Sequence, residues 1–501
     1  MDTIQKPSSS LQKIGMIGGL SATLLSILAI KYPDRLVFTE YRGIPSFSGS
    51  VLVGTTPSII KNKHKLQELI LENLEKIDGM TMLCHGLLMH KSILTVDPRN
   101  IEHFLKNNFE NYVKGPLLNE ASSDLLGHGI FNANGEVWRY QRKTASQIFN
   151  VKNFRDHFTQ IFVEHINYMV VNIFDIAMKN GTSVDFHDIM FKFTLDSFVK
   201  LGFGVDLHAL STKGKVPFAS SFDIVQQNAY IRFTNPYHKW TEKFTDFLFP
   251  WNVTIGQHIN IIDGFAYEVI KKRRQEIQQG EQFNDLLSRF METENEKGEL
   301  LNDTELRDVV LNMVIAGRDT TAQALSWTFY SLMEQPRVEE KLLKEINEYI
   351  PDGLEKDPAA LYEAIKNMKY AHAVFYEVLR LYPSVPNNQK YALNDDIWPD
   401  GTHIKKGDYV LWSTWAMGRS FKIWGPDAKQ FRPERWLNKD GELNREPQGQ
   451  NLATLEALVT ITSLLKRYRF SLMPNQLITY QISLTLPMKH GLKVFVHQRN
   501  Q

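Results

Sequence analysis

The stretch Ala316-Gly317-Arg318-Asp319-Thr320-Thr321 decides the fold class, because it lies in the middle of the longest helix that the sequence predicts. That helix runs from about Asn302 to Gln335. Asn302 and Glu305 form a capping pair at its start, and Pro336 marks its end. At 1.5 Å per residue the helix is roughly 50 Å long, which is enough to cross a whole domain.

The centre of this helix has an unfavourable composition. Gly317 is costly in a helix interior, and the hydroxyls of Thr320 and Thr321 can bond back to helix carbonyls. One interpretation is that small residues let a flat cofactor lie against the helix, with Asp319 on a proton path and Thr320 supplying a hydroxyl. The other is a packing notch against a second helix. The helix alone does not choose between them.

Composition indicates a globular protein with a large core. The chain has 501 residues, of which 43% are apolar and 23% are charged, and its net charge is +1. Such a balance gives no reason to expect nucleic acid as a partner. Cys84 is the only cysteine, which excludes an intramolecular disulfide and a cysteine zinc site. A reducing location that faces the cytosol fits best.

The N-terminal segment is predicted to be a membrane anchor. Ile14 to Ile30 is a run of 17 residues without a charge, and it rises about 25 Å as a helix, near the lower limit for spanning a bilayer. The alternative is a secretory signal peptide, but no clear small-residue cleavage site ends the run before Lys31. Lys31 and Arg35 follow the run, so the positive-inside tendency leaves the body in the cytosol.

The rest of the chain is organised around helices. We expect an anchor over residues 1–35, a linker rich in proline and glycine over 36–57, and a single domain over 58–501. The predicted fold class is mainly α with a minor β component. A late hairpin is predicted from Tyr480–Leu486 and Leu492–Val496.

A charged pair stands in an apolar helix. Glu377 and Arg380 are three residues apart and share one helix face, with apolar residues on both sides. An isolated pair of this kind is usually a surface salt bridge, whereas a buried pair needs further partners to offset its desolvation. Arg435, in the segment Phe431-Arg432-Pro433-Glu434-Arg435-Trp436, is the candidate partner.

These motifs together resemble the cytochrome P-450 family. Ala-Gly-x-Asp-Thr-Thr in a long helix is followed by Glu-x-x-Arg and then by Pro-Glu-Arg-Trp, in the family's order and at similar separations. The resemblance extends from about residue 36 to the C-terminus. It implies the cytochrome P-450 fold, with the long central helix over haem b. It also implies that Glu377, Arg380 and Arg435 form a structural triad on the haem side of the core.

The resemblance assigns cofactor and catalytic roles residue by residue. Trp138 and Arg142 match the family's Trp-x-x-x-Arg and are expected to approach a haem propionate. The central helix supplies the rest: Ala316, Gly317 and Thr321 are expected at the haem, and Asp319 and Thr320 are expected to deliver protons to iron-bound dioxygen.

Finer similarities indicate a subgroup. Asn107–Gly115, Leu126–Phe131 and Ala416–Arg419 look like the fungal alkane and plant fatty-acid hydroxylases, which act on long chains at or near the terminal carbon. The expected partners are therefore a lipophilic substrate, dioxygen, the membrane, and an NADPH-dependent flavoprotein reductase that supplies electrons. The anchor fits the microsomal branch, which implies a single-pass protein of the endoplasmic reticulum membrane.

One departure bears directly on the chemistry. The family's loop Phe-x-x-Gly-x-Arg-x-Cys-x-Gly, which carries the cysteine ligand of the iron, is absent. Gly449 matches the last glycine of that loop, but Pro447 stands where the cysteine belongs. Sequence on both sides keeps the family's character, so we predict a clean in-frame deletion near Gln448 and Gly449, and no metal ligand is assigned. Cys84 is not expected to replace the missing thiolate, which favours O–O cleavage in this family.

Three hypotheses follow from this pattern. The favoured one is that an exon segment was lost from this chain and that the locus encodes a haem-dependent monooxygenase for a fatty acid or an alkane. The second is a haem-less, non-catalytic lipid-binding protein anchored to the membrane. The third, an unrelated helical scaffold, requires four accidental motif matches and is remote.

Overall fold

The computed structural model of the chain describes residues 23, 43–46, 54–85, 91–148, 157–234, 238–283, 285–444 and 451–499. The predicted anchor, apart from Thr23, and most of the predicted linker lie outside the described residues. The predicted deletion site at Gln448 and Gly449 lies outside them as well. The expected anchor, linker and single domain therefore stay predictions.

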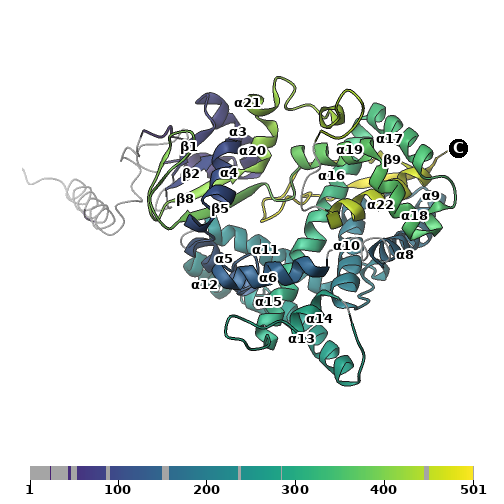
Figure 1. Cartoon of the computed structure of the whole chain (residues 1–501), viewed down its shortest axis with the longest axis horizontal. Helices are drawn as coiled ribbons and strands as arrows, with labels where there is room; N and C mark the ends of the chain where they lie inside the picture. The colour runs from purple at the N-terminus through teal and green to yellow at the C-terminus, as the bar shows by residue number, and fades with distance from the viewer. Residues whose placement is uncertain are drawn as a thin grey trace, which may run out of the picture. The chain divides into compact units, whose positions relative to one another are not determined.

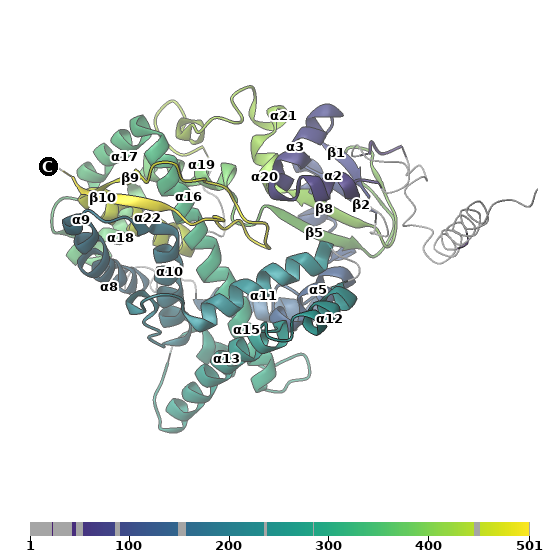
Figure 2. The same cartoon turned by 180° about the vertical axis from the view of Figure 1, so that it is seen from behind.

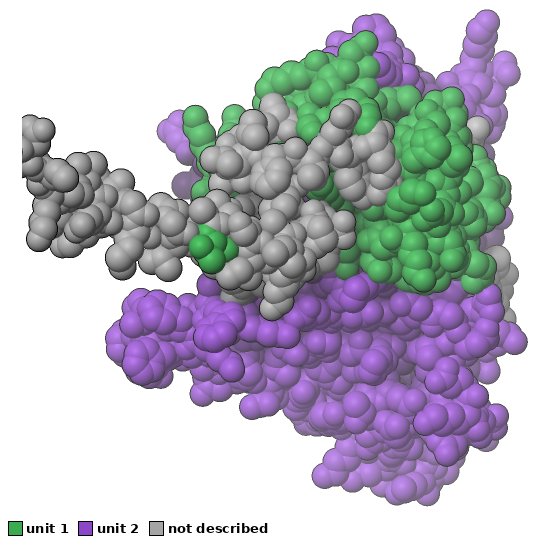
Figure 3. All heavy atoms as spheres, turned by 90° about the vertical axis from the view of Figure 1, so that its left-hand side faces the viewer, with its two compact units in different colours: residues 1–113, 389–412 green, residues 114–388, 413–501 purple. Residues whose placement is uncertain are grey.

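The chain forms two compact units, which Figure 3 colours separately. The first consists of residues 1–113 and 389–412, and the second of residues 114–388 and 413–501. Every site residue that the sequence predicts belongs to the second unit.

The first unit contains most of a five-stranded sheet in the order β1-β2-β8-β5-β3. β2 pairs in parallel with β8, and the β1–β2 and β3–β5 pairs are antiparallel. Phe104, Tyr112 and Trp398 pack in the core of this unit and are almost fully buried. The strands are β1 (Thr81–Cys84), β2 (Ser92–Thr95), β3 (Tyr112–Val113), β5 (Asn387–Ala392) and β8 (Tyr409–Ser413), and the main helices are α3 (Leu66–Lys76) and α4 (Pro98–Glu102).

The second unit is mostly helical, which confirms the predicted predominance of helix. Its helices, apart from the central one, are α5 (Pro116–Leu126), α6 (Gly135–Ile148), α8 (Thr159–Met169), α9 (Asp175–Asn180), α10 (Phe186–Phe203), α11 (Pro217–Thr234), α12 (His238–Leu248), α13 (Ile255–Gln278), α14 (Leu286–Met291), α17 (Pro336–Tyr349), α18 (Pro358–Asn367), α19 (Lys369–Leu381), α20 (Thr414–Arg419), α21 (Phe421–Trp424) and α22 (Asn451–Arg467).

The central helix of this unit matches the sequence prediction. α15 (Asp303–Val314) continues through a π-helical turn, η8 (Ile315–Asp319), into α16 (Thr320–Glu334). Asn302 and Glu305 form the predicted capping box. Figures 1 and 2 show α16 packed beside α10, α19 and α22. The π turn coincides with the stretch whose composition weakens the helix, and such turns are frequent at functional sites.

The late hairpin was wrong in its pairing. β10 (Lys493–Gln498) forms, but its partners are β9 (Tyr468–Leu472) and β4 (Val184–Asp185). Residues 480–486 contribute only an isolated bridge between Tyr480 and Met488. Their backbone is taken up elsewhere, because the Leu486 N–H donates to Ser384 and to the Gln323 side chain on α16.

One described segment, Thr159–Asn180, is long and apolar enough to cross a membrane. It passes through α8, the π turn η6 (Val170–Phe174) and α9. Phe162, Met169 and Phe174 on this segment are fully buried, and α8 packs on α10 and α22. The core therefore accounts for part of its apolar character, while Val171 and Ile176 are exposed.

Candidate functional site

Two residues of the central helix, Ala316 and Thr320, are partly exposed in an otherwise buried stretch. From Leu306 to Phe329, all of which the structure describes, every residue is buried except Ala316 and Thr320, which are half-buried. They lie four residues apart and therefore share a face. Thr320 Oγ1 donates to the Ala316 carbonyl at 2.6 Å, so its oxygen still has acceptor capacity toward the open side.

The opposite side of the π turn packs against α10. A Cβ atom on Gly317 would lie 1.8 Å from the ring of Phe198, so no larger residue fits without movement of that ring. Thr194 Oγ1 also donates to the Arg318 carbonyl at 2.9 Å. The packing interpretation of the weak centre therefore applies at Gly317, and the cofactor interpretation stays a prediction for the face of Ala316 and Thr320. The structure gives Gly317 a packing role, and its expected contact with a cofactor stays a prediction.

Asp319 is buried beside a cation that it shares with another helix. Arg318 Nη1 lies 3.1 Å from Asp319 Oδ1 and 2.7 Å from Oδ1 of Asp223 on α11. Burial raises the pKa of Asp319 to about 6, an effect that Arg318 opposes. A carboxyl group that titrates near neutrality can hold or release a proton, as the predicted role of Asp319 requires.

Thr321 does not reach the open face. It is buried, and its hydroxyl bonds to the carboxyl group of Glu456 on α22. Burial raises the pKa of Glu456 well above its ordinary value, and the bond from Thr321 opposes this shift. Thr321 therefore couples α16 to α22, and the structure does not bring it beside Ala316 and Thr320 as expected.

The predicted triad is assembled, because a fully buried carboxylate joins both arginines. Glu377 accepts from Arg380 Nε at 2.8 Å and from Arg380 Nη2 at 2.7 Å. Arg435 Nε donates to Glu377 Oε1 at 2.9 Å. The Arg432 amide and the Trp436 indole also donate to this carboxylate, at 2.8 and 3.0 Å. The sequence therefore predicted the members of this cluster, and their expected action on a haem stays a prediction.

The arginines of the triad also bind the surrounding backbone. Arg380 donates to the carbonyls of Gly418, Ala428 and Gln430. A Cβ atom on Gly418 would lie 2.0 Å from the Arg380 carbonyl oxygen. This close approach explains the glycine in Ala416-Met417-Gly418-Arg419, a stretch that the sequence singled out only by its resemblance to hydroxylases.

Trp138 and Arg142 lie one turn apart on α6. Trp138 is half-buried and Arg142 is exposed. Between them, Gln141 Nε2 donates to the His128 carbonyl at 3.0 Å and ties the helix to the preceding loop. The expected propionate contacts of Trp138 and Arg142 stay predictions.

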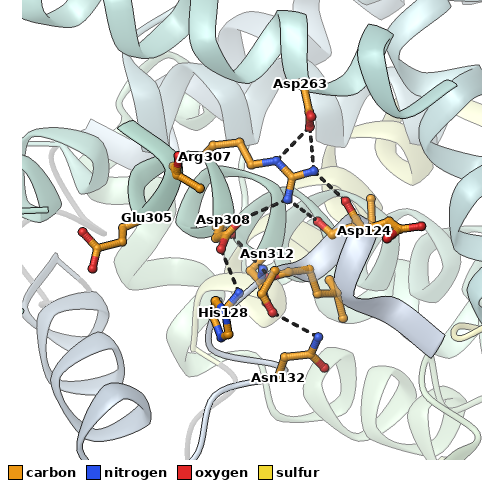
Figure 4. A network of polar contacts seen from close by, with 12 residues as sticks. Asp124, His128, Asn132, Asp263, Glu305, Arg307, Asp308 and Asn312 are labelled. Atoms are coloured by element: carbon orange, nitrogen blue, oxygen red, sulfur yellow. Dashed lines mark hydrogen bonds and ion pairs between the residues drawn. The ribbon is translucent and has the colours of Figure 1, made fainter. Parts of the chain in front are cut away.

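Sequence reasoning missed three buried polar residues next to the predicted site residues of the central helix. Arg307, Asp308 and Asn312 on α15 are buried and bind the segment between α5 and α6, as Figure 4 shows. The available signal was spacing: Asp308 and Asn312 continue the series of four that Ala316 and Thr320 follow. Buried polar residues inside a core helix require partners, so the series was a usable indication.

The described residues could form one side of a haem site, but they include no cysteine at the position expected for the iron ligand. Small and hydroxyl-bearing side chains at Ala316 and Thr320 leave one face of the helix open. The sole thiol, Cys84, lies in β1, and burial raises its pKa to about 12, so it is a protonated thiol at neutral pH. No group of three or more His, Cys, Asp or Glu among the described residues could hold a metal ion.

Comparisons with known proteins agree on one family. The family model described as Cytochrome P450 matches residues 45–492. Cytochrome P450 86B1 of Arabidopsis thaliana is 37% identical over 436 residues, which cover 82% of this chain and 78% of that protein. Cytochrome P450 704B1 of the same plant is 36% identical over 455 residues, with 81% and 86% covered. Cytochrome P450 monooxygenase cyp1 of Mycosarcoma maydis is 33% identical over 510 residues, with 93% and 77% covered.

Proposed function

The chain belongs to the cytochrome P450 family, whose members are monooxygenases, and we propose that its gene encodes a haem-dependent hydroxylase of a fatty acid or an alkane. One observation carries the proposal: between Leu306 and Phe329 the central helix is buried except at Ala316 and Thr320. The relatives support a lipophilic substrate. The similarity of Leu126–Phe131 and Ala416–Arg419 to alkane and fatty-acid hydroxylases supports the narrower class, by analogy.

The chain as written does not meet the requirements of a cysteine-ligated haem. Pro447 occupies the ligand position, and proline offers only a backbone carbonyl. Cys84, the only thiol in the sequence, lies in β1 of the first unit, whereas the predicted site residues all belong to the second. No catalytic step is therefore assigned to this 501-residue form. We attribute the difference to an exon segment lost from this form, because the motifs on both sides are intact.

The transcript provides the first test. Sequencing it across the codons of Gln448 and Gly449 should reveal a form with an inserted segment that encodes a cysteine. That form should give the Soret band of a thiolate-ligated haem in a reduced, carbon-monoxide difference spectrum. The 501-residue form, expressed in parallel, should not. If no transcript restores a cysteine, the enzymatic proposal for this locus is wrong.

The second candidate function is a non-catalytic lipid-binding protein, and the missing ligand is the observation that favours it. It requires the 501-residue form to bind a long-chain acid without haem. Equilibrium dialysis of that form with radiolabelled dodecanoic acid measures this directly. A thiolate-type Soret band from the 501-residue form would exclude this candidate.

We place the protein on the endoplasmic reticulum membrane with its body in the cytosol, where a flavoprotein reductase supplies electrons from NADPH. The orientation of α12 supports membrane contact. Trp240, Phe244 and Phe247 point away from the protein and are 78%, 62% and 79% exposed. On the inner side of α12, Glu242 pairs with Arg232 at 2.6 Å, while Lys239, Lys243 and Asp246 are exposed. Aromatic side chains on one exposed helix face are typical of helices that lie in a membrane interface.

A further inference from the structure

The segment between α5 and α6 is bound to the central helix through its backbone. Asp308 Oδ2 accepts from the His128 amide at 2.7 Å. Asn312 Oδ1 accepts from the Phe131 amide at 3.0 Å, and its Nδ2 donates to the Leu126 carbonyl at 2.8 Å. Figure 4 shows Asp308 directed at the backbone of His128. One turn of α15 therefore holds both ends of the segment, here called the 127–132 loop.

Two glycines make this approach possible. A Cβ atom on Gly127 would lie 2.1 Å from the carboxylate of Asp308, and Gly127 has a φ of +49°. A Cβ atom on Gly129 would lie 2.0 Å from Asn312 Nδ2. Gly127 thus combines close contact with a backbone conformation that L-residues rarely adopt. The pattern Leu-Gly-His-Gly-Ile-Phe is accounted for by its fit against Asp308 and Asn312.

Asp308 is itself held by a buried arginine, Arg307. Arg307 donates to Asp308 Oδ1 at 2.9 Å, to Asp263 on α13 at 2.6 Å, and to the Asp124 carbonyl at 2.6 Å. Figure 4 shows its guanidinium between Asp263 and the end of α5, while Glu305 points away from the cluster. A second set of bonds holds the far side of the loop, where Lys114 Nζ donates to the carbonyls of Ile130 and Phe131.

The loop is bound next to the half-buried positions of the central helix. Asp308, Asn312, Ala316 and Thr320 succeed one another at intervals of four residues, and neighbours in this series, such as Asn312 and Ala316, share a helix face. Asp308 and Asn312 form hydrogen bonds with the 127–132 loop, whereas Ala316 and Thr320 are half-buried. The loop therefore ends where the open face begins, one turn before Ala316. Gln141, which bonds to the His128 carbonyl, ties α6 to the same loop.

We propose that Asp308 and Asn312 are positioning residues, which fix the 127–132 loop as one wall of the ligand cavity at Ala316 and Thr320 and thereby set where α6 lies. The proposal rests on the proposed function only in calling the open face a ligand cavity. If the two residues only stabilise the fold, replacing them should lower the free energy of unfolding without a selective effect on the loop. If they position the loop, replacing them should expose individual loop amides to exchange and widen the range of distances between α6 and the central helix.

Hydrogen exchange on the full 501-residue chain separates these roles. With electron-transfer fragmentation, Asp308→Ala should accelerate exchange of the His128 amide by about tenfold or more, and Asn312→Ala should do so for Phe131. Asp308→Asn keeps an acceptor and should restore most of the protection. Thr328→Ala is the control, because Thr328 is equally buried on α16 and bonds only within its own helix. Equal acceleration in the control would overturn the proposal.

Spin labels test the effect on α6. Lys143→Cys on α6 and Thr304→Cys at the start of α15 are both exposed positions. The native Cys84 has a pKa of about 12 and labels slowly. We expect one narrow distance distribution in the parent and in Thr328→Ala, and a distribution at least twofold wider in Asn312→Ala. An unchanged width in Asn312→Ala refutes the positioning role.

Dodecanoic acid serves as the ligand probe and keeps two failures apart. In the parent chain it should slow exchange at residues 130–131 and 316–320, and Asn312→Ala should abolish the effect at 130–131 alone. If the acid protects 316–320 but never the loop, the inference is wrong and the proposed substrate class stands. If it protects no amide while the variants behave as expected, the substrate class is wrong for this chain and the positioning role stands.

Discussion

Replacing Glu377 by alanine tests the buried charge cluster most directly. The change leaves Arg380 and Arg435, whose side chains are 2% and 6% exposed, without their shared carboxylate. Breaking a buried ion pair in this way costs about 3–5 kcal/mol. Arg380 keeps three backbone carbonyls and Arg435 keeps Asp427 as a neighbour, while the Trp436 indole loses its acceptor. We therefore expect about 4 kcal/mol.

The chain contains a matched control for this prediction. Glu136 and Arg139 on α6 are also a glutamate and an arginine three residues apart, but they are 67% and 52% exposed. An exposed pair contributes about 0–1 kcal/mol. Urea unfolding of the second unit, followed by pulse proteolysis, should show a much larger loss of stability for Glu377→Ala than for Glu136→Ala. A loss for Glu377→Ala no greater than that of the control would refute the argument from burial.

Three further changes have defined outcomes. Burial raises the pKa of Asp319 from 3.8 to about 6, so the native state binds a proton that the unfolded state has released. The free energy of unfolding should therefore fall as pH rises from about 4 to 6, by up to roughly 3 kcal/mol. Asp319→Asn should remove this pH dependence from urea unfolding measured across that range. Gly317→Ala should lower the free energy of unfolding by about 1–3 kcal/mol through its clash with Phe198, and Phe198→Leu in the same chain should recover part of the loss in thermal melts. Brominated lipid in reconstituted vesicles should quench the fluorescence of the exposed Trp240. The fraction of tryptophan fluorescence that the lipid quenches should therefore fall in Trp240→Leu and should not fall in Trp327→Leu, which removes a buried tryptophan.

Local signals were sufficient for the elements that carry the site. Capping by Asn302 and the stop at Pro336 bound the central helix to within a residue at each end. The apolar flanks of Glu377 and Arg380 correctly indicated burial. The partner of β10 was not predictable in this way, because strand pairing is a long-range choice. What kept residues 480–486 out of that sheet was Gln323 and Ser384, which no local pattern connects to them.

The site itself was predictable only where a motif marked it. Asp308 and Asn312 precede the motif and were overlooked, since a buried polar residue on a helix is recognised by its partners, and those lie some 180 residues earlier in the chain. The expected place of Thr321 at the cofactor stays a prediction. Adjacent residues on a helix point about 100° apart, so Thr320 and Thr321 have different neighbours, and Thr321 interacts with Glu456 on α22.

The structure also bears on why the ligand segment is missing. A chain that is no longer under selection should accumulate substitutions, most of which are destabilising. Buried ionisable groups should be among the first to be replaced, because their desolvation must be offset by specific partners. Here Glu377 remains fully buried with both arginines in place, and Glu456 remains buried with one oxygen unpaired among the described residues. These groups lie on either side, in the sequence, of the deletion predicted near Gln448. The difference is confined to the ligand segment while the demanding geometry around it persists, which favours the recent loss of one coding segment over gradual decay.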